Sequence, residues 1–460
     1  MPVGAMPQTW DRVGHAGVEG DSLGGDRSQR TVPAIMEGVS VARPVVLAAV
    51  AVLASGACAS LTAGSEGSDE ATSPATTGGN TADTVLIDPA GRDPLPFPGY
   101  EVDRVTIAPL PGSADDDGSA APTTEALTGW AAFDQSLWQQ IVQGGSQAFS
   151  VAVSIGGEVV HEAALGLKTW GTFELVDTDD RFRIASISKT ISAITALQLV
   201  EAGVIGLDDP IGGLVAARVG VARPADRTTD ITVRQLLTHT SGFAQYESLF
   251  FRDQVESCEE AAAVGFARSL SGTPGGGFRY SNMNYCVLGL LIEQLTERSY
   301  EAVVYEQLLT PLGISGMRLA STYDPGPDEV QHRSVPGRNY MEVLGAAGAW
   351  VATPSDLVRI LDSLDHGTPG FKPLDPETVA AMKTSVNGGV PDRGYGMGLI
   401  LYGGGTSGHT GTIESTHAMV VDRPDNITWA VTVAGEHPSD TPRLASMVQR
   451  ALVAGGFLPA

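Results

Sequence analysis

The sequence predicts an α+β domain of two lobes, in which one sheet is built from both ends of the globular part of the chain. Residues 148–155 and 158–165 have strand-like composition on either side of a Gly-Gly turn, which predicts a β-hairpin. Residues 186–343 are helical in pattern and rich in loops. Later strands are predicted at residues 396–401, 418–421 and 428–433, and flanking helices at residues 130–142 and 442–453. Strands at both ends favour one sheet closed by distant segments, with a helical lobe inserted between them.

The composition excludes several classes of protein. The 460 residues are 42% hydrophobic and 18% charged, which is typical of a globular chain with a large core. With 28 basic and 53 acidic residues the net charge is −25. No nucleic acid is expected as a partner, because phosphate binding needs a basic face. The histidines and cysteines show no metal-ligand spacing, so neither a metal nor another cofactor is predicted.

The N-terminal part is predicted to direct the chain out of the cytoplasm. Residues 44–54 are apolar, follow Arg43 and precede small residues, as in the hydrophobic region and cleavage site of a secretory signal. A start at Met36 would give that signal an ordinary length. We therefore expect an N-terminal extension without structure at residues 1–35, the signal at 36–58, a disordered acidic linker at 59–124 and the globular domain at 125–460.

Cys58 is a candidate for lipidation. It follows Gly56-Ala57 and resembles the cysteine of a bacterial lipobox, which is lipidated and becomes the mature N-terminus. Ser55 stands where that motif usually has leucine or valine. Two outcomes stay open: a lipoprotein on the outer face of the cytoplasmic membrane, or a cleaved and secreted protein. The lipoprotein would contact the membrane only through its N-terminal lipid anchor, and the secreted protein would have no such anchor.

The first catalytic candidate is the pair Ser186 and Lys189, at the start of the helix predicted after the hairpin. Residues i and i+3 share one face of a helix, so the Lys189 amine is expected to reach the Ser186 hydroxyl. Serine becomes a good nucleophile only when a nearby base takes its proton. The spacing supplies that base within one helical turn.

The second candidate is Tyr280-Ser281-Asn282, in a loop that precedes an apolar helix. A phenol near a lysine ammonium can move a proton between nucleophile and leaving group. The Asn282 amide could hold both the lysine and a substrate amide. The alternative is a plain helix N-cap behind turn glycines.

The third candidate is Ser-Gly-His-Thr-Gly-Thr at residues 407–412, where a glycine-rich turn is expected to enter an edge strand. Gly411 is expected to let a substrate backbone come close, and Thr410 to offer its hydroxyl to the substrate. The backbone N–H groups of Ser186 and Thr412 are the expected donors to an oxyanion.

Ser-x-x-Lys, Tyr-Ser-Asn and His-Thr-Gly, in this order, resemble the serine β-lactamase and penicillin-binding-protein superfamily. Residues 231–242, 309–313 and 348–357 are similar to its branch of class C β-lactamases, D-alanyl-D-alanine carboxypeptidases and esterases. The resemblance covers roughly residues 125–455. It implies a β-lactamase/transpeptidase-like fold, with an antiparallel sheet flanked by helices and an inserted helical lobe.

The resemblance also implies roles for the candidate residues. Ser186 matches the nucleophile, Lys189 the activating base, Tyr280 the proton shuttle and Asn282 the orienting amide. His409 stands where class C β-lactamases carry lysine, and a histidine there is similar to D-alanyl-D-alanine carboxypeptidases. A neutral His409 at pH 7 would leave a substrate carboxylate without a permanent charge at this position.

We therefore expect a serine hydrolase outside the cytoplasm that acts through an acyl-enzyme on amide or ester bonds. The leading substrate is a D-Ala-D-Ala stem peptide of peptidoglycan. Carboxylesterase and class C-like β-lactamase activities are the alternatives, so the partner is a small peptide, ester or β-lactam, and the chain is expected to be a monomer. A non-catalytic penicillin- or peptidoglycan-binding sensor is the alternative from a different class.

Three further residues carry expectations of their own. Cys258 and Cys286 could pair in an oxidising compartment, but two separate buried thiols are the favoured arrangement. His239 is expected to bind backbone groups rather than to react.

Overall fold

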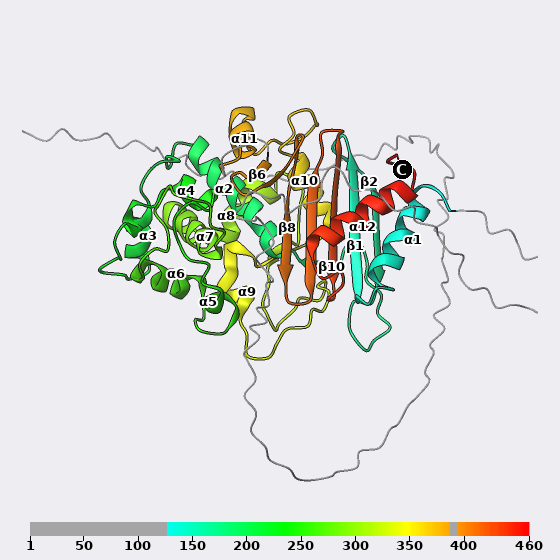
Figure 1. Ribbon diagram of the computed structural model, residues 1–460, viewed down its shortest axis with the longest axis horizontal. Coiled ribbons are helices and arrows are strands. Elements are labelled where there is room, and N and C mark those ends of the chain that lie inside the picture. The colour runs from blue at the N-terminus through cyan, green and yellow to red at the C-terminus, as the bar shows by residue number, and fades with distance from the viewer. Residues whose placement is uncertain (1–126, 387–392, 460) are drawn as a thin grey trace, which may run out of the picture. The chain divides into compact units, whose positions relative to one another are not determined.

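The computed structural model describes residues 127–386 and 393–459, and the predicted signal, Cys58 and the linker lie outside these ranges. Its main element is a seven-stranded sheet in the order β2-β1-β10-β9-β8-β7-β6 (Figure 1). The strands are β1 (Ala148–Ile155), β2 (Glu158–Gly166), β6 (Arg393–Tyr395), β7 (Ile400–Gly403), β8 (Thr406–Ile413), β9 (Thr416–Asp422) and β10 (Ile427–Ala434). All the neighbouring pairs are antiparallel. The predicted α+β class is confirmed.

The two ends of the domain lie side by side in this sheet. Strand β1 pairs with β10 over its full length, from Ala148 opposite Ala434 to Ile155 opposite Ile427. The hairpin of β1 and β2 is therefore joined to the sheet only by the last strand of the chain. This is the closure by distant segments that the order of elements predicts.

Helices cover both faces of the sheet. Helices α1 (Gly129–Ile141) and α12 (Thr441–Ala454) lie across one face (Figure 1), where Phe133, Leu137 and Leu444 pack on apolar side chains of β1, β9 and β10. Helices α2 (Ser188–Glu201) and α10 (Pro354–Asp362) belong to the larger core on the other face. Successive side chains of a strand point to opposite faces, so the same strands supply both cores.

The inserted lobe consists mainly of the long helix α7 (Asn282–Thr296) and shorter helices. The shorter helices are α3 (Gly212–Arg218), α4 (Val233–Leu237), α5 (Glu247–Phe251), α6 (Cys258–Ala267), α8 (Tyr300–Val304), α9 (Tyr340–Leu344) and α11 (Pro376–Met382), with a π-helical turn at Tyr305–Leu309. Residues 282–292 of α7 are all buried, which explains why residues 285–292 are apolar on every side of the helix. A small sheet of β3 (Phe182–Arg183), β5 (Trp350–Ala352) and β4 (Arg318–Leu319) lies where the lobe begins.

One predicted strand is wrong. Residues 396–401 form the turn between β6 and β7, and only the last two of them are in a strand. Gly398 has φ +76°, and a Cβ there would lie 2.4 Å from Ala193 Cβ in α2. Met397 and Leu399 are buried because this turn packs on α2, so their apolar character does not indicate a strand.

The expectation of two separate thiols is also wrong, because Cys258 and Cys286 form a disulfide with their Cα atoms 5.6 Å apart. The bond joins the first residue of α6 to the fifth residue of α7. Closing a loop of this length constrains the unfolded chain and contributes about 3 kcal/mol in the entropic model. Disulfides of this kind persist in oxidising compartments.

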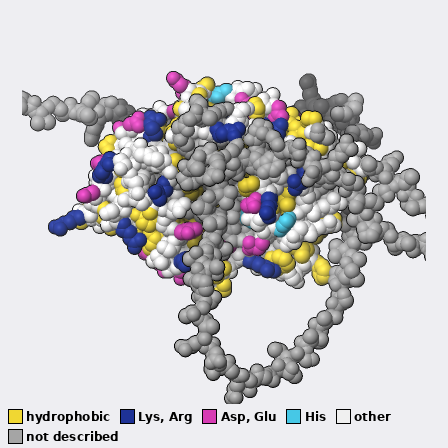
Figure 2. All heavy atoms as spheres, viewed as in Figure 1, with side chains coloured by type: hydrophobic (Ala, Val, Ile, Leu, Met, Phe, Trp, Pro, Cys, Tyr) yellow, Lys and Arg dark blue, Asp and Glu magenta, His cyan; other side chains and the backbone are white. Residues whose placement is uncertain are grey.

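Within the described residues, no helix has the length and apolar character needed to cross a membrane. On the face shown in Figure 2, basic and acidic side chains lie scattered among one another over the helical lobe.

Candidate active site

Ser186 lies in a strained turn at the end of β3. The turn is the short 3₁₀ helix Ala185–Ile187, which leads directly into α2. Ala185 has φ +47°, a left-handed conformation that costs energy for any residue with a Cβ. The residues on either side of Ser186, Ala185 and Ile187, are buried, whereas Ser186 itself is partly exposed. The fold therefore presents the Ser186 hydroxyl to solvent.

Lys189 is fully buried, and its ammonium is held by three oxygen atoms. Nζ lies 3.0 Å from Ser186 Oγ, 2.8 Å from Asn282 Oδ1 and 2.8 Å from the carbonyl oxygen of Ala347. An ammonium group has three donors, and these three acceptors match them. In the neutral form, two hydrogens would serve Asn282 and Ala347 and the lone pair would face Ser186 Oγ. The arrangement is therefore suited to take a proton from the serine.

Tyr280 and Asn282 reach the same lysine from the start of α7. Ser281 is the N-cap of that helix, and its side chain accepts from the Met283 N–H. The N-cap alternative is thus correct for Ser281, while Asn282 turns its amide oxygen toward Lys189. The Tyr280 ring lies 4.8 Å from Lys189 Nζ, measured to the ring centroid. Both Tyr280 and Asn282 are 7% exposed, at the edge of the buried pair.

Strand β8 completes the site but is only partly the predicted edge strand. It is interior in the order of the sheet, yet its pairing with β7 ends at Gly408. Among the described residues, positions 409–413 have a strand partner only on the β9 side. A strand segment without a neighbouring strand on one side can bind an extended peptide as an added strand.

Gly411 packs against the turn that carries Ser186. A Cβ built on it would lie 2.1 Å from the carbonyl oxygen of Ile184 and 3.1 Å from Ala185 Cβ. Glycine is therefore required for the packing of β8 on the turn that carries Ser186, and the expectation that Gly411 also lets a substrate backbone come close stays a prediction. Thr412 is the next residue of β8 after Gly411. The use of the Ser186 and Thr412 amides as oxyanion donors, and of the Thr410 hydroxyl for substrate, stays a prediction.

Replacing Gly411 by alanine is expected to push β8 away from the Ser186 turn. Displacing a catalytic group by about 1 Å can cost about 10²-fold in rate, so we expect a loss of that size in kcat/KM. Overpacking should also destabilise the fold by about 1–3 kcal/mol. Ester hydrolysis and thermal unfolding would measure the two effects. Gly213→Ala is the matched control, because its nearest contact is 3.9 Å away, and it should leave activity unchanged.

His409 is buried under the site and holds no charge for a substrate. Its side chain is 0% exposed, with Nε2 3.1 Å from the Tyr395 hydroxyl and Nδ1 2.7 Å from the Thr410 carbonyl oxygen. A proton on Nδ1 and a lone pair on Nε2 satisfy both contacts. Burial lowers the pKa of His409 to about 3 from 6.5, with a further contribution from the charge of Lys189. The predicted neutral form is thus the form that the environment favours.

The low pKa of His409 predicts a loss of stability in acid. The unfolded chain takes up the proton first as the pH falls below about 6.5, so the free energy of unfolding decreases from there downward. This residue alone should cost about 2 kcal/mol near pH 5 relative to pH 7. Urea unfolding of the wild type and His409→Gln would measure it: the variant should lose less stability between these pH values. An equal loss of stability in the wild type and in His409→Gln would contradict the low pKa assigned to His409.

Two contributors were missed by reasoning from the sequence. The Ala347 carbonyl and the Tyr395 hydroxyl both belong to segments far from Ser186 in the chain, and the likeness of residues 348–357 to a family motif is the signal that marks the neighbourhood of Ala347. His239, which is expected to bind backbone groups, does so: its ring Nδ1 accepts from the Ser281 N–H. No signal in the sequence indicates Tyr395.

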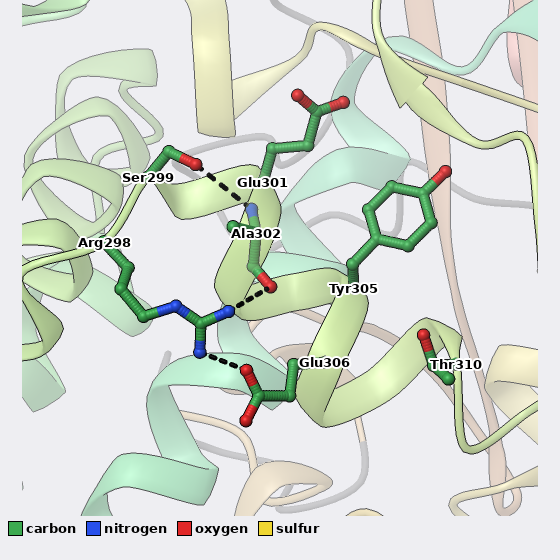
Figure 3. Close-up of a pocket in the computed structure, with 7 residues that line it drawn as sticks. All are labelled: Arg298, Ser299, Glu301, Ala302, Tyr305, Glu306 and Thr310. Carbon is green, nitrogen blue, oxygen red and sulfur yellow. Dashed lines mark hydrogen bonds and ion pairs between the residues drawn. The ribbon is translucent and has the colours of Figure 1, made fainter.

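A hollow on the helical lobe (Figure 3) is lined by none of the catalytic candidates. It has a volume of about 600 Å³ and is lined by Arg298, Ser299, Glu301, Ala302, Tyr305, Glu306 and Thr310. Its polar groups are largely engaged: Arg298 pairs with Glu306, and Tyr305 donates to the Met317 carbonyl oxygen. In residues 127–386 and 393–459, no group of three or more His, Cys, Asp or Glu is placed to hold a metal ion.

The comparisons with known proteins agree with this geometry. The model of the family described as beta-lactamase matches residues 131–453. The chain belongs to this family. It is a serine hydrolase of the β-lactamase and penicillin-binding-protein type, and the recognition made from the three motifs is confirmed, together with the β-lactamase/transpeptidase-like fold.

Two curated relatives and one solved structure illustrate the family. Penicillin-binding protein 4 of Amycolatopsis lactamdurans is 28% identical over 59% of this chain and 76% of its own length. Esterase EstB of Burkholderia gladioli is 28% identical over 64% of this chain and 86% of its own. SurE, whose crystal structure was determined with D-Leu, is 27% identical with a TM-score of 0.58, and the match covers 71% of this chain and 76% of SurE.

Proposed function

We propose that this beta-lactamase-family protein is an extracytoplasmic hydrolase of the D-alanyl-D-alanine carboxypeptidase type, acting on peptidoglycan stem peptides. The observation that carries its chemistry is the contact of Lys189 Nζ with Ser186 Oγ at 3.0 Å, fixed by Asn282 and Ala347. A penicillin-binding protein among the relatives, and a similar structure with bound D-Leu, support a D-amino acid substrate. The Cys258–Cys286 disulfide and the predicted signal at residues 36–58 support the location.

The reaction follows from the positions of these residues. Ser186 Oγ attacks the carbonyl carbon of the substrate, while Lys189 and Tyr280 share the role of the base. The negative charge on the oxygen would lie between the amides of Ser186 and Thr412. The bond to the leaving amine or alcohol then breaks, Tyr280 returns the proton to it, and an ester on Ser186 remains. Water hydrolyses this acyl-enzyme and regenerates the serine.

A carboxylesterase activity is the second candidate, and the state of His409 favours it. A peptide that ends in D-Ala carries a carboxylate, whereas His409 is buried and neutral and is bound to Tyr395 and Thr410. Simple esters need no cation at this position. An esterase among the relatives adds to this support.

Labelling with a fluorescent penicillin separates the candidates. A lasting label that is absent from Ser186→Ala would support the carboxypeptidase type, since slow release of the acyl group is typical of penicillin-binding proteins. A label that forms and clears within seconds would indicate a β-lactamase. Reaction with a fluorophosphonate or a p-nitrophenyl ester, but not with penicillin, would favour the esterase. No reaction with any of these reagents would contradict the proposed hydrolase and favour a binding sensor.

A further inference from the structure

His239 holds the backbone on both sides of Tyr280. Its carbonyl oxygen accepts from the Arg279 N–H at 2.8 Å, and its ring Nδ1 accepts from the Ser281 N–H at 3.2 Å. Arg279 and Tyr280 are the two residues between these amides, and the Ser281 amide belongs to the peptide group that directly follows Tyr280. One residue, about forty positions earlier in the chain, therefore holds both ends of this short segment and limits where the Tyr280 side chain can point.

The contacts of the His239 ring define its protonation. Nδ1 also accepts from the Asn284 side-chain amide at 2.8 Å, and the orientation of that amide is set by Ser241 Oγ, which donates to Asn284 Oδ1. Two donors on Nδ1 place the proton on Nε2. The ring is 0% exposed, and among the described residues Nε2 has no hydrogen-bond partner.

Filling space does not account for a histidine at this position. A buried N–H without a partner is unfavourable, and His239 also has φ +56°, which is strained for a residue with a side chain of this size. An apolar ring would pack equally well on Tyr280, whose ring centroid lies 4.3 Å away. What histidine adds is the acceptor Nδ1. The strain and the unpaired N–H are concentrated beside Lys189 and Tyr280, which is where strained residues typically serve function.

We propose that His239 is a positioning residue for proton transfer: its Nδ1 lone pair fixes the Ser281 amide, in the peptide group that follows Tyr280, so that Tyr280 faces the leaving group. The inference rests on the proposed role of Tyr280 in the hydrolase reaction. His239 itself does not contact substrate, because it is buried behind the Tyr280 ring. The expected consequence is selective: loss of the acceptor harms reactions whose leaving group needs a proton more than reactions whose leaving group departs as an anion.

Two substitutions at this position separate the acceptor from the ring. His239→Phe keeps a ring and removes Nδ1. His239→Asn keeps an acceptor atom at the same distance from the backbone, and asparagine tolerates a positive φ. The substrates are an alkyl ester and a p-nitrophenyl ester of the same acyl group, because p-nitrophenolate leaves without a proton.

For His239→Phe we expect kcat/KM on the alkyl ester to fall by about 10- to 100-fold, with a smaller loss on the p-nitrophenyl ester. His239→Asn should restore most of the alkyl ester rate. In a Tyr280→Phe background, the His239→Phe change should have little further effect, since both act through one group. Equal losses on the two esters, or no rescue by asparagine, would overturn the proposal.

A measurement on the wild type covers the case in which the phenylalanine variant fails to fold. A ¹H–¹⁵N spectrum of the histidine rings should show His239 neutral, with the proton on Nε2, and the signal would be assigned by its loss in His239→Asn. A proton on Nδ1 would overturn the inference. A different result would contradict the proposed function: a wild-type protein that hydrolyses neither ester and is not labelled by fluorophosphonate.

Discussion

Replacing Ser186 by alanine is expected to reduce kcat by about 10⁶-fold, the loss typical of removing a serine nucleophile. The remaining Lys189, Tyr280 and Asn282 cannot compensate, because none of them can form the acyl-enzyme that divides the reaction into two easier steps. The fold should tolerate the change, since Ser186 is partly exposed and its hydroxyl is bound to the Lys189 side chain. Steady-state ester hydrolysis and thermal unfolding would be measured together.

Ser188→Ala is the control for this loss. Ser188 lies two residues further along the same turn, but its Oγ is buried and accepts from the Trp350 N–H. This variant should be less stable and should keep its turnover. A Ser186→Ala protein with more than a trace of activity, once contamination by the wild type is excluded, would show that another residue is the nucleophile.

Replacing Lys189 by methionine should have the second-largest effect. Methionine has similar length but offers no base to Ser186 Oγ, and a positioned general base contributes about 10²–10⁴-fold in rate. Asn282 Oδ1 and the Ala347 carbonyl oxygen would also lose their donor, so a loss of stability is expected as well. The rate of fluorophosphonate labelling and the midpoint of urea unfolding report these two effects.

Lys372 provides the matched comparison for Lys189. Its Nζ also donates to oxygen atoms, those of the Asp365 main chain and the Thr368 hydroxyl, in a loop that contains none of the site residues. Lys372→Met should lower stability and leave the labelling rate unchanged. If Lys189→Met reacted as fast as the wild type while folded, Lys189 would not be the base.

The pairing of Ser186 with Lys189 could be predicted from the sequence because both residues lie on one helical turn. Local geometry alone brings the two side chains together, and the structure places their polar atoms 3.0 Å apart. The hairpin of β1 and β2 could be predicted for a similar reason, because its turn and both strands are contiguous in the chain. The three motifs together indicated the family, although each of them alone is common in loops.

The remaining features depend on contacts between distant segments. Lys189 and the Ala347 carbonyl oxygen are 158 positions apart, and a main-chain acceptor leaves no mark on the identity of its residue. The disulfide depends on α6 and α7 being neighbours, which the 28-residue separation of the cysteines does not reveal. The packing of Gly411 against Ile184 could not be predicted either, because it joins segments that only the folded chain brings together.

The most direct test of the central claim is to trap the acyl-enzyme and locate it. The protein would be mixed with a slowly hydrolysed ester or penicillin, quenched in acid and digested, and its peptides examined by mass spectrometry. The account predicts one added acyl group on the peptide that contains Ser186, absent from Ser186→Ala and present in Ser188→Ala. An acyl group on any other residue, or rapid turnover with no covalent intermediate, would contradict it.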